Sequence, residues 1–254
     1  MLAYSEYGTN RGSSLIIAHG LYGSQRNWVT IAKHLSDTRH VITVDMRNHG
    51  QSFWSKNHEY SHMAQDLANV INHFGAPMDV LGHSMGGKAA MLLALNHPNT
   101  LRRLVIGDIA PVSYNHTQLH IIKAMKAVDL SCVVRKSDAN TQLEKLGVDA
   151  NLCSFLTQSL DIKTKKWRLN LDSIEQNMPA IMSFPEIDTV HLGPTLFLTG
   201  DLSNYVLTKN RSIIQSLFTK AKFAKIKQAG HWLHAEKPRE FADTVRTYLD
   251  TAVF

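Results

Sequence analysis

Short, mostly apolar runs alternate along the chain with longer segments in which apolar residues recur at helical spacing. Continuous apolar runs indicate strands buried on both faces, as in a parallel sheet. The runs expected to form strands are 15–18, 41–44, 78–81, 104–106, 195–198 and 223–226. The segments expected to form helices between them are 28–35, 63–74, 88–96 and 213–218. This alternation predicts an α/β fold with a mostly parallel, doubly wound sheet.

One long interval, residues 115–185, breaks this alternation. It contains no convincing buried strand, whereas amphipathic stretches occur at 119–128 and 139–146. A structureless loop of this length is uncommon inside a compact domain. We therefore expect residues 115–185 to form a helical cap, inserted into a core domain that consists of residues 1–114 and 186–254.

A glycine-rich turn, 82–87, stands between the strand expected at 78–81 and the helix expected at 88–96, with the sequence Gly-His-Ser-Met-Gly-Gly. Gly-x-Ser-x-Gly in this context is the pattern of a nucleophile elbow, in which glycines allow a strained serine to project above the sheet. The five-residue pattern also occurs in ordinary turns. Its flanking strand and helix favour the catalytic interpretation, so Ser84 is the candidate nucleophile.

Two further polar residues follow strands at the same edge of the predicted sheet, where open α/β sheets bind their ligands. Asp108 follows the strand at 104–106, and His231 follows the last predicted strand. The order Ser, Asp, His is that of the α/β-hydrolase triad and differs from the orders of chymotrypsin and subtilisin. We expect His231 to take the proton of Ser84 and Asp108 to orient the imidazole.

Asp201 is an alternative acid, because many enzymes of this fold place the acid after the penultimate strand. The acid usually stands three residues after the glycine of that turn, where this chain has Ser203 rather than Asp201. Asp108 lies directly at a strand end. We therefore favour Asp108 over Asp201.

The first buried strand is followed by a second glycine-containing turn, 19–24. We expect the backbone amides of Leu21 and Met85 to hold the oxyanion that develops during the reaction, each donor being worth roughly 3 kcal/mol. His19 is expected to order this turn through hydrogen bonds. The loop at 45–52 is expected to be structural, with Asp45 buried and hydrogen-bonded.

The composition excludes several other classes of protein. The chain has 27 Lys+Arg against 21 Asp+Glu, and its basic clusters at 163–168 and 220–227 resemble solvated faces rather than a nucleic-acid-binding module. No His, Asp or Glu trio has metal-ligand spacing, so we expect no metal site. The sequence also lacks a secretory signal and a membrane-spanning run, which predicts a cytoplasmic protein without stable membrane insertion.

Five segments in this order resemble the α/β-hydrolase superfamily and, within it, the YbfF-type esterases. They are 19–24, 44–52, 82–88, 108–112 and 230–238. The resemblance implies a cofactor-free hydrolase of carboxylic esters or thioesters with a small helical cap, and it supports Asp108, because these relatives place their acid there. For an acyl-CoA thioester, the basic cluster at 163–168 could meet the phosphates.

The expected function is therefore that of a serine hydrolase that cleaves carboxylic esters, or acyl thioesters, through an acyl-serine intermediate. Two alternatives use the same triad: a C–C bond hydrolase or lyase, and a small-molecule receptor with slow turnover. Epoxide hydrolases and haloalkane dehalogenases are disfavoured, because their elbow carries an aspartate where this chain has Ser84. Apolar residues of the cap are expected mainly in its core, with some facing the pocket and favouring an acyl chain: Met125, Phe155, Trp167, Met178, Met182 and Phe184.

Overall fold

The computed structural model describes residues 1–9 and 12–251. A seven-stranded sheet in the order β1-β3-β2-β4-β5-β8-β9 forms its centre. The strands are β1 (Tyr4–Tyr7), β2 (Leu15–Ala18), β3 (Val41–Val44), β4 (Met78–His83), β5 (Leu101–Gly107), β8 (Thr195–Gly200) and β9 (Ala221–Ile226). Neighbours pair in parallel except β1, which runs antiparallel to β3. The predicted mostly parallel sheet is confirmed.

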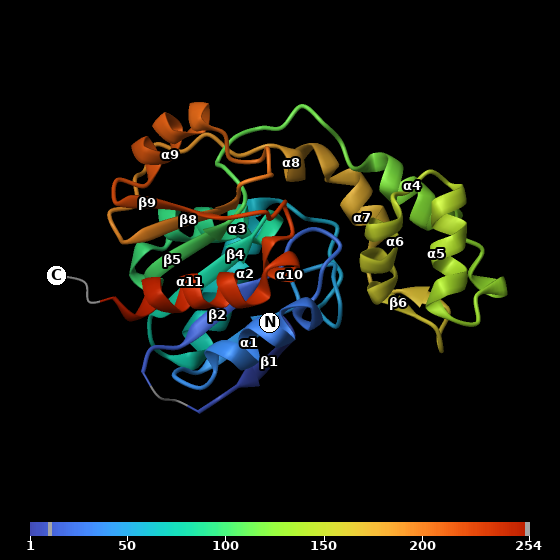
Figure 1. Cartoon of the computed structure of the whole chain (residues 1–254), viewed down its shortest axis with the longest axis horizontal. Coiled ribbons are helices and arrows are strands. Elements are labelled where there is room, and N and C mark those ends of the chain that lie inside the picture. The colour runs from blue at the N-terminus through green and yellow to red at the C-terminus, as the bar shows by residue number, and fades with distance from the viewer. Residues whose placement is uncertain (10–11, 252–254) are drawn as a thin grey trace.

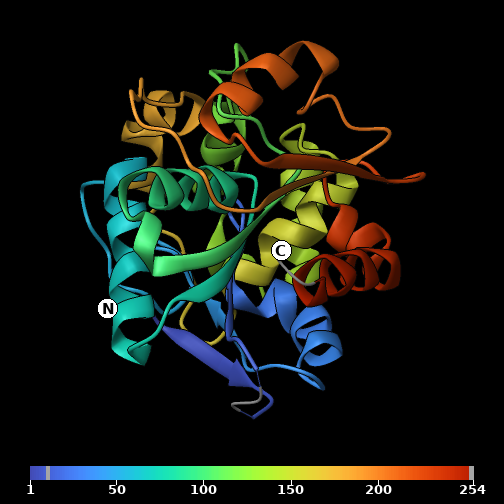
Figure 2. The ribbon, with the colours of Figure 1, turned by 90° about the vertical axis from the view of Figure 1, so that its left-hand side faces the viewer.

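Helices cover both faces of this sheet. One face packs against α2 (Tyr60–Phe74), α3 (Met85–Asn96) and α9 (Arg211–Leu217), and the other packs against α1 (Val29–Leu35) and α11 (Pro238–Asp250). Figure 2 shows α2 and α3 on one side of the strands and α1 and α11 on the other. β2, β3 and β4 are buried along their whole lengths. Burial on both faces explains why these strands read as continuous apolar runs.

The chain between β5 and β8 forms a separate group of short elements. They are α4 (Leu119–Ala127), α5 (Lys136–Lys145), α6 (Ala150–Leu156), β6 (Leu160–Asp161), β7 (Lys166–Trp167), α7 (Leu171–Gln176) and α8 (Met178–Met182). Figure 1 shows α4 to α7 and β6 together to one side of the sheet. Their apolar side chains bury one another in a cluster of their own, to which Tyr22 is added from outside the segment. The small hairpin of β6 and β7 was not predicted.

The sequence patterns also failed to predict two elements, the strand β1 of the main sheet and the helix α11 that covers one of its faces. β1 contains Ser5 and Glu6 and is only partly buried, so it lacks the apolar run that identifies a central strand. α11 begins at Pro238, which suits a first helical turn, and buries Phe241 and Val245 at helical spacing. A search for continuous apolar runs therefore cannot find β1. It also overlooks α11, whose apolar residues recur at helical spacing.

α3 approaches the sheet more closely than side chains would allow. A Cβ atom added to Gly82 would lie 2.3 Å from the carbonyl oxygen of Gly86, and one added to Gly86 would lie 2.5 Å from the carbonyl oxygen of Ala18. Both obstacles are backbone atoms, which cannot rotate away. Glycine at these positions therefore allows α3 to rest directly on β4 and β2.

We expect Gly86→Ala to destabilise the fold by about 1–3 kcal/mol, because the added methyl group must push α3 away from β2. Gly107→Ala is the matched control, since its added Cβ would find its nearest neighbour at 3.4 Å, an ordinary contact distance. Denaturant unfolding of both variants checks this. Equal loss of unfolding free energy in the two variants would contradict the close-packing argument.

A buried lysine joins α3 to the end of α8. Lys88 is 1% exposed, and its Nζ donates hydrogen bonds to the carbonyl oxygens of Met182 at 3.2 Å and Ser183 at 2.6 Å. The same Nζ lies 4.8 Å from the centre of the Tyr114 ring, within the range of a cation–π contact. Burial lowers the pKa of Lys88 to about 7.

The lowered pKa of Lys88 predicts a pH-dependent stability. Between about pH 7 and its ordinary value of 10.5, the unfolded chain keeps a proton that the folded chain has lost, so raising the pH favours folding. Relative to Lys88→Met, the wild type should gain at least about 1 kcal/mol of unfolding free energy between pH 7 and 9.5. Lys33→Met, at an exposed position on α1, is the control. A wild-type-minus-variant difference that is constant with pH would contradict this prediction.

Candidate active site

Ser84 lies at the sharp turn between β4 and α3. Its backbone has φ 52° and ψ −118°, a conformation that costs an L-residue about 1–3 kcal/mol. The turn is held by two hydrogen bonds, from the Ser84 amide to the Gly107 carbonyl at 3.0 Å and from the Lys88 amide to the Ser84 carbonyl at 3.0 Å. The side chain stands at the carboxyl edge of the sheet, partly exposed.

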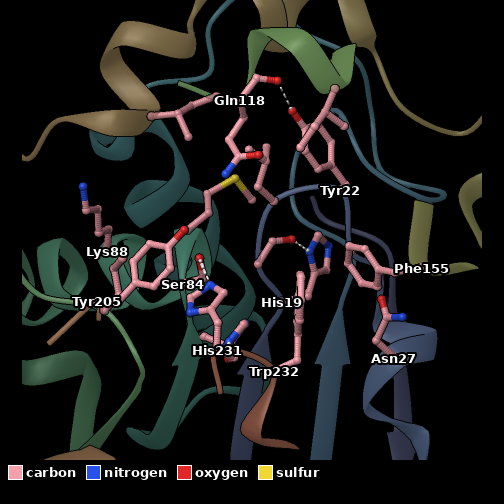
Figure 3. Close-up of a pocket in the computed structure, with 18 of the residues that line it drawn as sticks. His19, Tyr22, Asn27, Ser84, Lys88, Gln118, Phe155, Tyr205, His231 and Trp232 are labelled. Atoms are coloured by element: carbon pink, nitrogen blue, oxygen red, sulfur yellow. Dashed lines mark hydrogen bonds between the residues drawn. The ribbon is translucent and has the colours of Figure 1, made fainter. Parts of the chain in front are cut away.

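Ser84, His231 and Asp108 form a continuous hydrogen-bonded chain. The Ser84 hydroxyl lies 3.1 Å from Nε2 of His231, and Nδ1 of His231 lies 2.7 Å from Oδ2 of Asp108. Figure 3 shows the first of these contacts. The ring of Tyr205 stacks on the imidazole with centroids 4.0 Å apart. With Asp108 as acceptor, Nδ1 carries the proton and Nε2 is free to accept the serine proton.

Asp108 is completely buried, and three donors converge on its carboxylate. Besides His231, the Gly200 amide donates to Oδ1 at 3.2 Å, and the Ser203 hydroxyl donates to Oδ2. Hydrogen bonds of this kind favour the ionised carboxylate and offset the cost of burying it. Ser203 therefore supports the Asp108 carboxylate from the position at which many enzymes of this fold place their acid.

Asp201, the alternative acid, lies outside this chain of contacts. It is exposed, and its Oδ1 accepts a hydrogen bond from the Ala229 amide at 3.3 Å. Within residues 1–9 and 12–251, no hydrogen bond joins Asp201 to His231. The structure thus brings Ser84, Asp108 and His231 together and leaves Asp201 apart.

Leu21 and Met85 lie beside the same cavity as Ser84. Both residues line that cavity, and neither amide donates to a protein acceptor in the part of the chain that the structure describes. A Cβ added to Gly20 would lie 3.1 Å from Cβ of Ser84, so the backbone of this turn passes directly beside the serine. Two unpaired N–H groups at this place can receive a negatively charged oxygen.

Buried histidines hold the backbone turns around Ser84 in place through hydrogen bonds. His19 donates from Nδ1 to the Gly20 carbonyl at 2.8 Å and accepts from the Met46 amide at Nε2, at 2.9 Å, which confirms that it orders the turn. His49 accepts from the Tyr22 amide at 3.2 Å. Burial lowers the pKa of His19 and lowers that of His49 well below its usual value, so both stay neutral and able to accept.

Two residues with no expected role, His49 and His83, therefore contact the site. His83 precedes the nucleophile, and its Nε2 donates to the carbonyl oxygen of His231 at 2.8 Å, which holds the backbone of that residue. Burial keeps the pKa of His83 well below its usual value. Only their contacts across the fold identify these two histidines, because nothing in their local sequence marks them.

Asp45 has the structural role expected of it. It is 2% exposed, and its carboxylate accepts hydrogen bonds from the backbone N–H of Gln25 at 2.8 Å and from the backbone N–H of Gln51 at 2.9 Å. The loop at 45–52 is thereby tied to the segment that follows the turn at 19–24.

A cavity of about 200 Å³ lies over Ser84. The walls contributed by the α4–α8 segment are mostly apolar and comprise Ile121, Leu152, Phe155, Ile181 and Met182. Of the apolar residues singled out above, Phe155 and Met182 therefore face the cavity. Met125, Trp167 and Met178 are buried within their own cluster, and Phe184 packs against the main core. None of the cavity's lining residues comes from the basic cluster at 163–168.

Two other properties bear on the chemistry available here. The described residues contain no group of three or more His, Cys, Asp or Glu side chains placed to hold a metal ion. No helix within residues 1–9 and 12–251 combines the length and the apolarity needed to cross a membrane.

Comparisons with known proteins agree with this geometry. A model of the alpha/beta hydrolase fold family matches residues 14–128. The sn-1-specific diacylglycerol lipase ABHD11 of Mus musculus is 41% identical over 248 residues, which cover 93% of this chain and 80% of that protein. Esterase YbfF of Escherichia coli is 33% identical over 253 residues, covering 98% of this chain and 97% of its own.

A solved structure supports the same assignment. A marine microorganism esterase is 38% identical and superposes with a TM-score of 0.92, covering 97% of this chain and 98% of its own. Similarity at this level extends over the sheet and over the α4–α8 segment alike. The chain therefore belongs to the α/β-hydrolase family and, within it, to the YbfF-like esterases, which makes it a carboxylic ester hydrolase.

Proposed function

We propose that this protein hydrolyses carboxylic esters through an acyl-serine intermediate, with Ser84 as nucleophile, His231 as general base and acid, and Asp108 as the acid that orients the histidine. The single observation that carries the proposal is the unbroken hydrogen-bonded chain from Ser84 through His231 to Asp108 beneath the cavity.

Each step of the proposed reaction has a group to perform it. Nε2 of His231 accepts the proton as the Ser84 oxygen bonds to the ester carbon, and the carbonyl oxygen becomes an oxyanion beside the amides of Leu21 and Met85. The tetrahedral intermediate then collapses. The alcohol leaves with the proton from His231, and the acyl group remains on Ser84. Water repeats the sequence and releases the carboxylic acid.

The walls of the cavity support an apolar acyl group as one part of the substrate. Phe155, Leu152 and Ile121 would bury such a chain, and each buried methylene group contributes about 0.8 kcal/mol. The ABHD11 relatives are named as diacylglycerol lipases, which also act on acyl esters. A thioester can follow the same acyl-serine route.

We also propose that residues 115–185 act as a cap over a core formed by residues 1–114 and 186–254. Support comes from the separate apolar cluster of this segment and from its contribution to the cavity walls. A cap of this kind excludes water from the reacting ester and selects the acyl chain.

Ser84→Ala should lower the kcat for 4-nitrophenyl esters at least about 1000-fold, and Asp108→Asn should lower it by a similar factor or more, because the histidine loses its tautomer and orientation. Asp201→Asn is the matched control and should keep most of the activity. Steady-state assays with acetyl to decanoyl esters check this. Asp201→Asn activity as low as that of Asp108→Asn would overturn the assignment of the acid.

Multiple turnovers by the wild-type protein distinguish an esterase from a receptor of the same fold. We expect far more product than enzyme, preceded by a burst of 4-nitrophenol equal to the enzyme concentration if deacylation is the slower step. Product that stops at one equivalent would favour the receptor. Cleavage of a vinylogous diketone but not of esters would favour a C–C hydrolase.

A further inference from the structure

Several polar groups on the cavity wall already form hydrogen bonds within the protein. The hydroxyl of Tyr22 donates to the Gln118 carbonyl at 3.2 Å, and the hydroxyl of Tyr60 donates to the Ile181 carbonyl at 2.6 Å. The amino group of Lys88 is occupied by the end of α8. These groups hold the cavity together and have their donors engaged within the fold.

The side chain of Gln118 differs from them. It lines the cavity, and its amide makes no hydrogen bond within the residues that the structure describes. Figure 3 shows the amide pointing from the α4 side into the cavity, across from Ser84 and His231. The residue is partly exposed, which leaves the amide accessible to a bound molecule.

The backbone of Gln118 is nevertheless firmly held. Its carbonyl oxygen accepts from the Tyr22 hydroxyl and from the Ile121 amide at 3.1 Å, where α4 begins. Tyr22 directly follows Leu21, which lines the cavity. The backbone of Gln118 is therefore fixed beside the turn that would hold the oxyanion, while its side-chain amide faces the cavity.

We propose that Gln118 is a specificity-determining residue that binds a hydroxyl group on the alcohol portion of the ester, so that the preferred substrate is a partial ester of a polyol. This inference rests on the proposed ester hydrolysis. A few precisely placed polar groups in a mostly apolar pocket fix the orientation of a ligand. Gln118 can supply one of them, because its side-chain amide makes no hydrogen bond among the described residues.

The chemistry of the carboxamide selects the hydroxyl group. The amide of Gln118 offers one acceptor and two donors, and a hydroxyl can both donate to it and accept from it, whereas an ester oxygen can only accept. The apolar walls suit the acyl chain, so the polar partner belongs to the alcohol that leaves. An alcohol without the hydroxyl would leave this amide unpaired when the substrate displaces water.

The test uses two esters with the same acyl group, 2,3-dihydroxypropyl butanoate and propyl butanoate. The readout is the ratio of their kcat/KM values in the wild type, in Gln118→Leu and in Gln176→Leu. Gln176→Leu makes the same chemical change at an exposed residue of α7 and is the control. Comparing ratios between variants cancels the difference in intrinsic reactivity of the two esters.

In the wild type, kcat/KM for the dihydroxypropyl ester divided by kcat/KM for the propyl ester should be about ten times larger than in Gln118→Leu. A factor of about ten corresponds to the loss of one neutral hydrogen bond. Gln176→Leu should keep the wild-type ratio. If Gln118→Leu lowers kcat/KM for both esters by the same factor, or leaves the ratio unchanged, hydroxyl recognition by Gln118 is overturned while ester hydrolysis stands. If the wild type hydrolyses neither ester, the proposed function fails and this inference fails with it.

Discussion

The close approach of α3 to the sheet is the constraint on which the active site depends. Without a side chain at Gly82 or Gly86, the helix rests on the backbone of β4 and β2, and the connection between strand and helix must turn within a single residue. Ser84 takes up that turn in a left-handed conformation. The packing of the core thus offsets the strain at Ser84 and sets the direction of its hydroxyl.

Two further turns at the same sheet edge complete the centre by the same means. Tyr22 and Asp108 also have positive φ values, of 62° and 50°. Asp108 is buried with donors from three directions, so among the residues that the structure describes its carboxylate is held without an arginine or lysine partner. The neutral histidines His19 and His49 fasten the turn around Leu21 through ring nitrogens rather than charges. The site is therefore preorganised mainly by hydrogen bonds among buried groups.

Much of this arrangement could be predicted from the sequence, because burial leaves a direct pattern. The runs at 15–18 and 41–44 match β2 and β3 to the residue, and the strand ends at Ser84, Asp108 and His231 meet because parallel strands present their carboxyl ends at one edge. β1 was not predicted because this edge strand contains Ser5 and Glu6 and has no continuous apolar run.

The contacts of Ser203 and Gln118 could not be predicted in the same way. Ser203 approaches Asp108 across 95 residues of chain, and Gln118 reaches the cavity from the α4 side, so neither role has a local signature. Ser203 did carry one partial signal, its position three residues after Gly200, where this fold usually places the acid. The substrate-facing wall depends on how the α4–α8 segment packs over the sheet, which no periodicity in one sequence specifies.

An activated Ser84 should react with a fluorophosphonate, and mass spectrometry of the peptides locates the label. Such reagents phosphonylate a serine only where a base and an oxyanion site activate it. We expect one equivalent of label on the wild-type protein, located on Ser84 and lost in Asp108→Asn. Label on another residue, or an unmodified protein, would show that Ser84 is not the activated nucleophile.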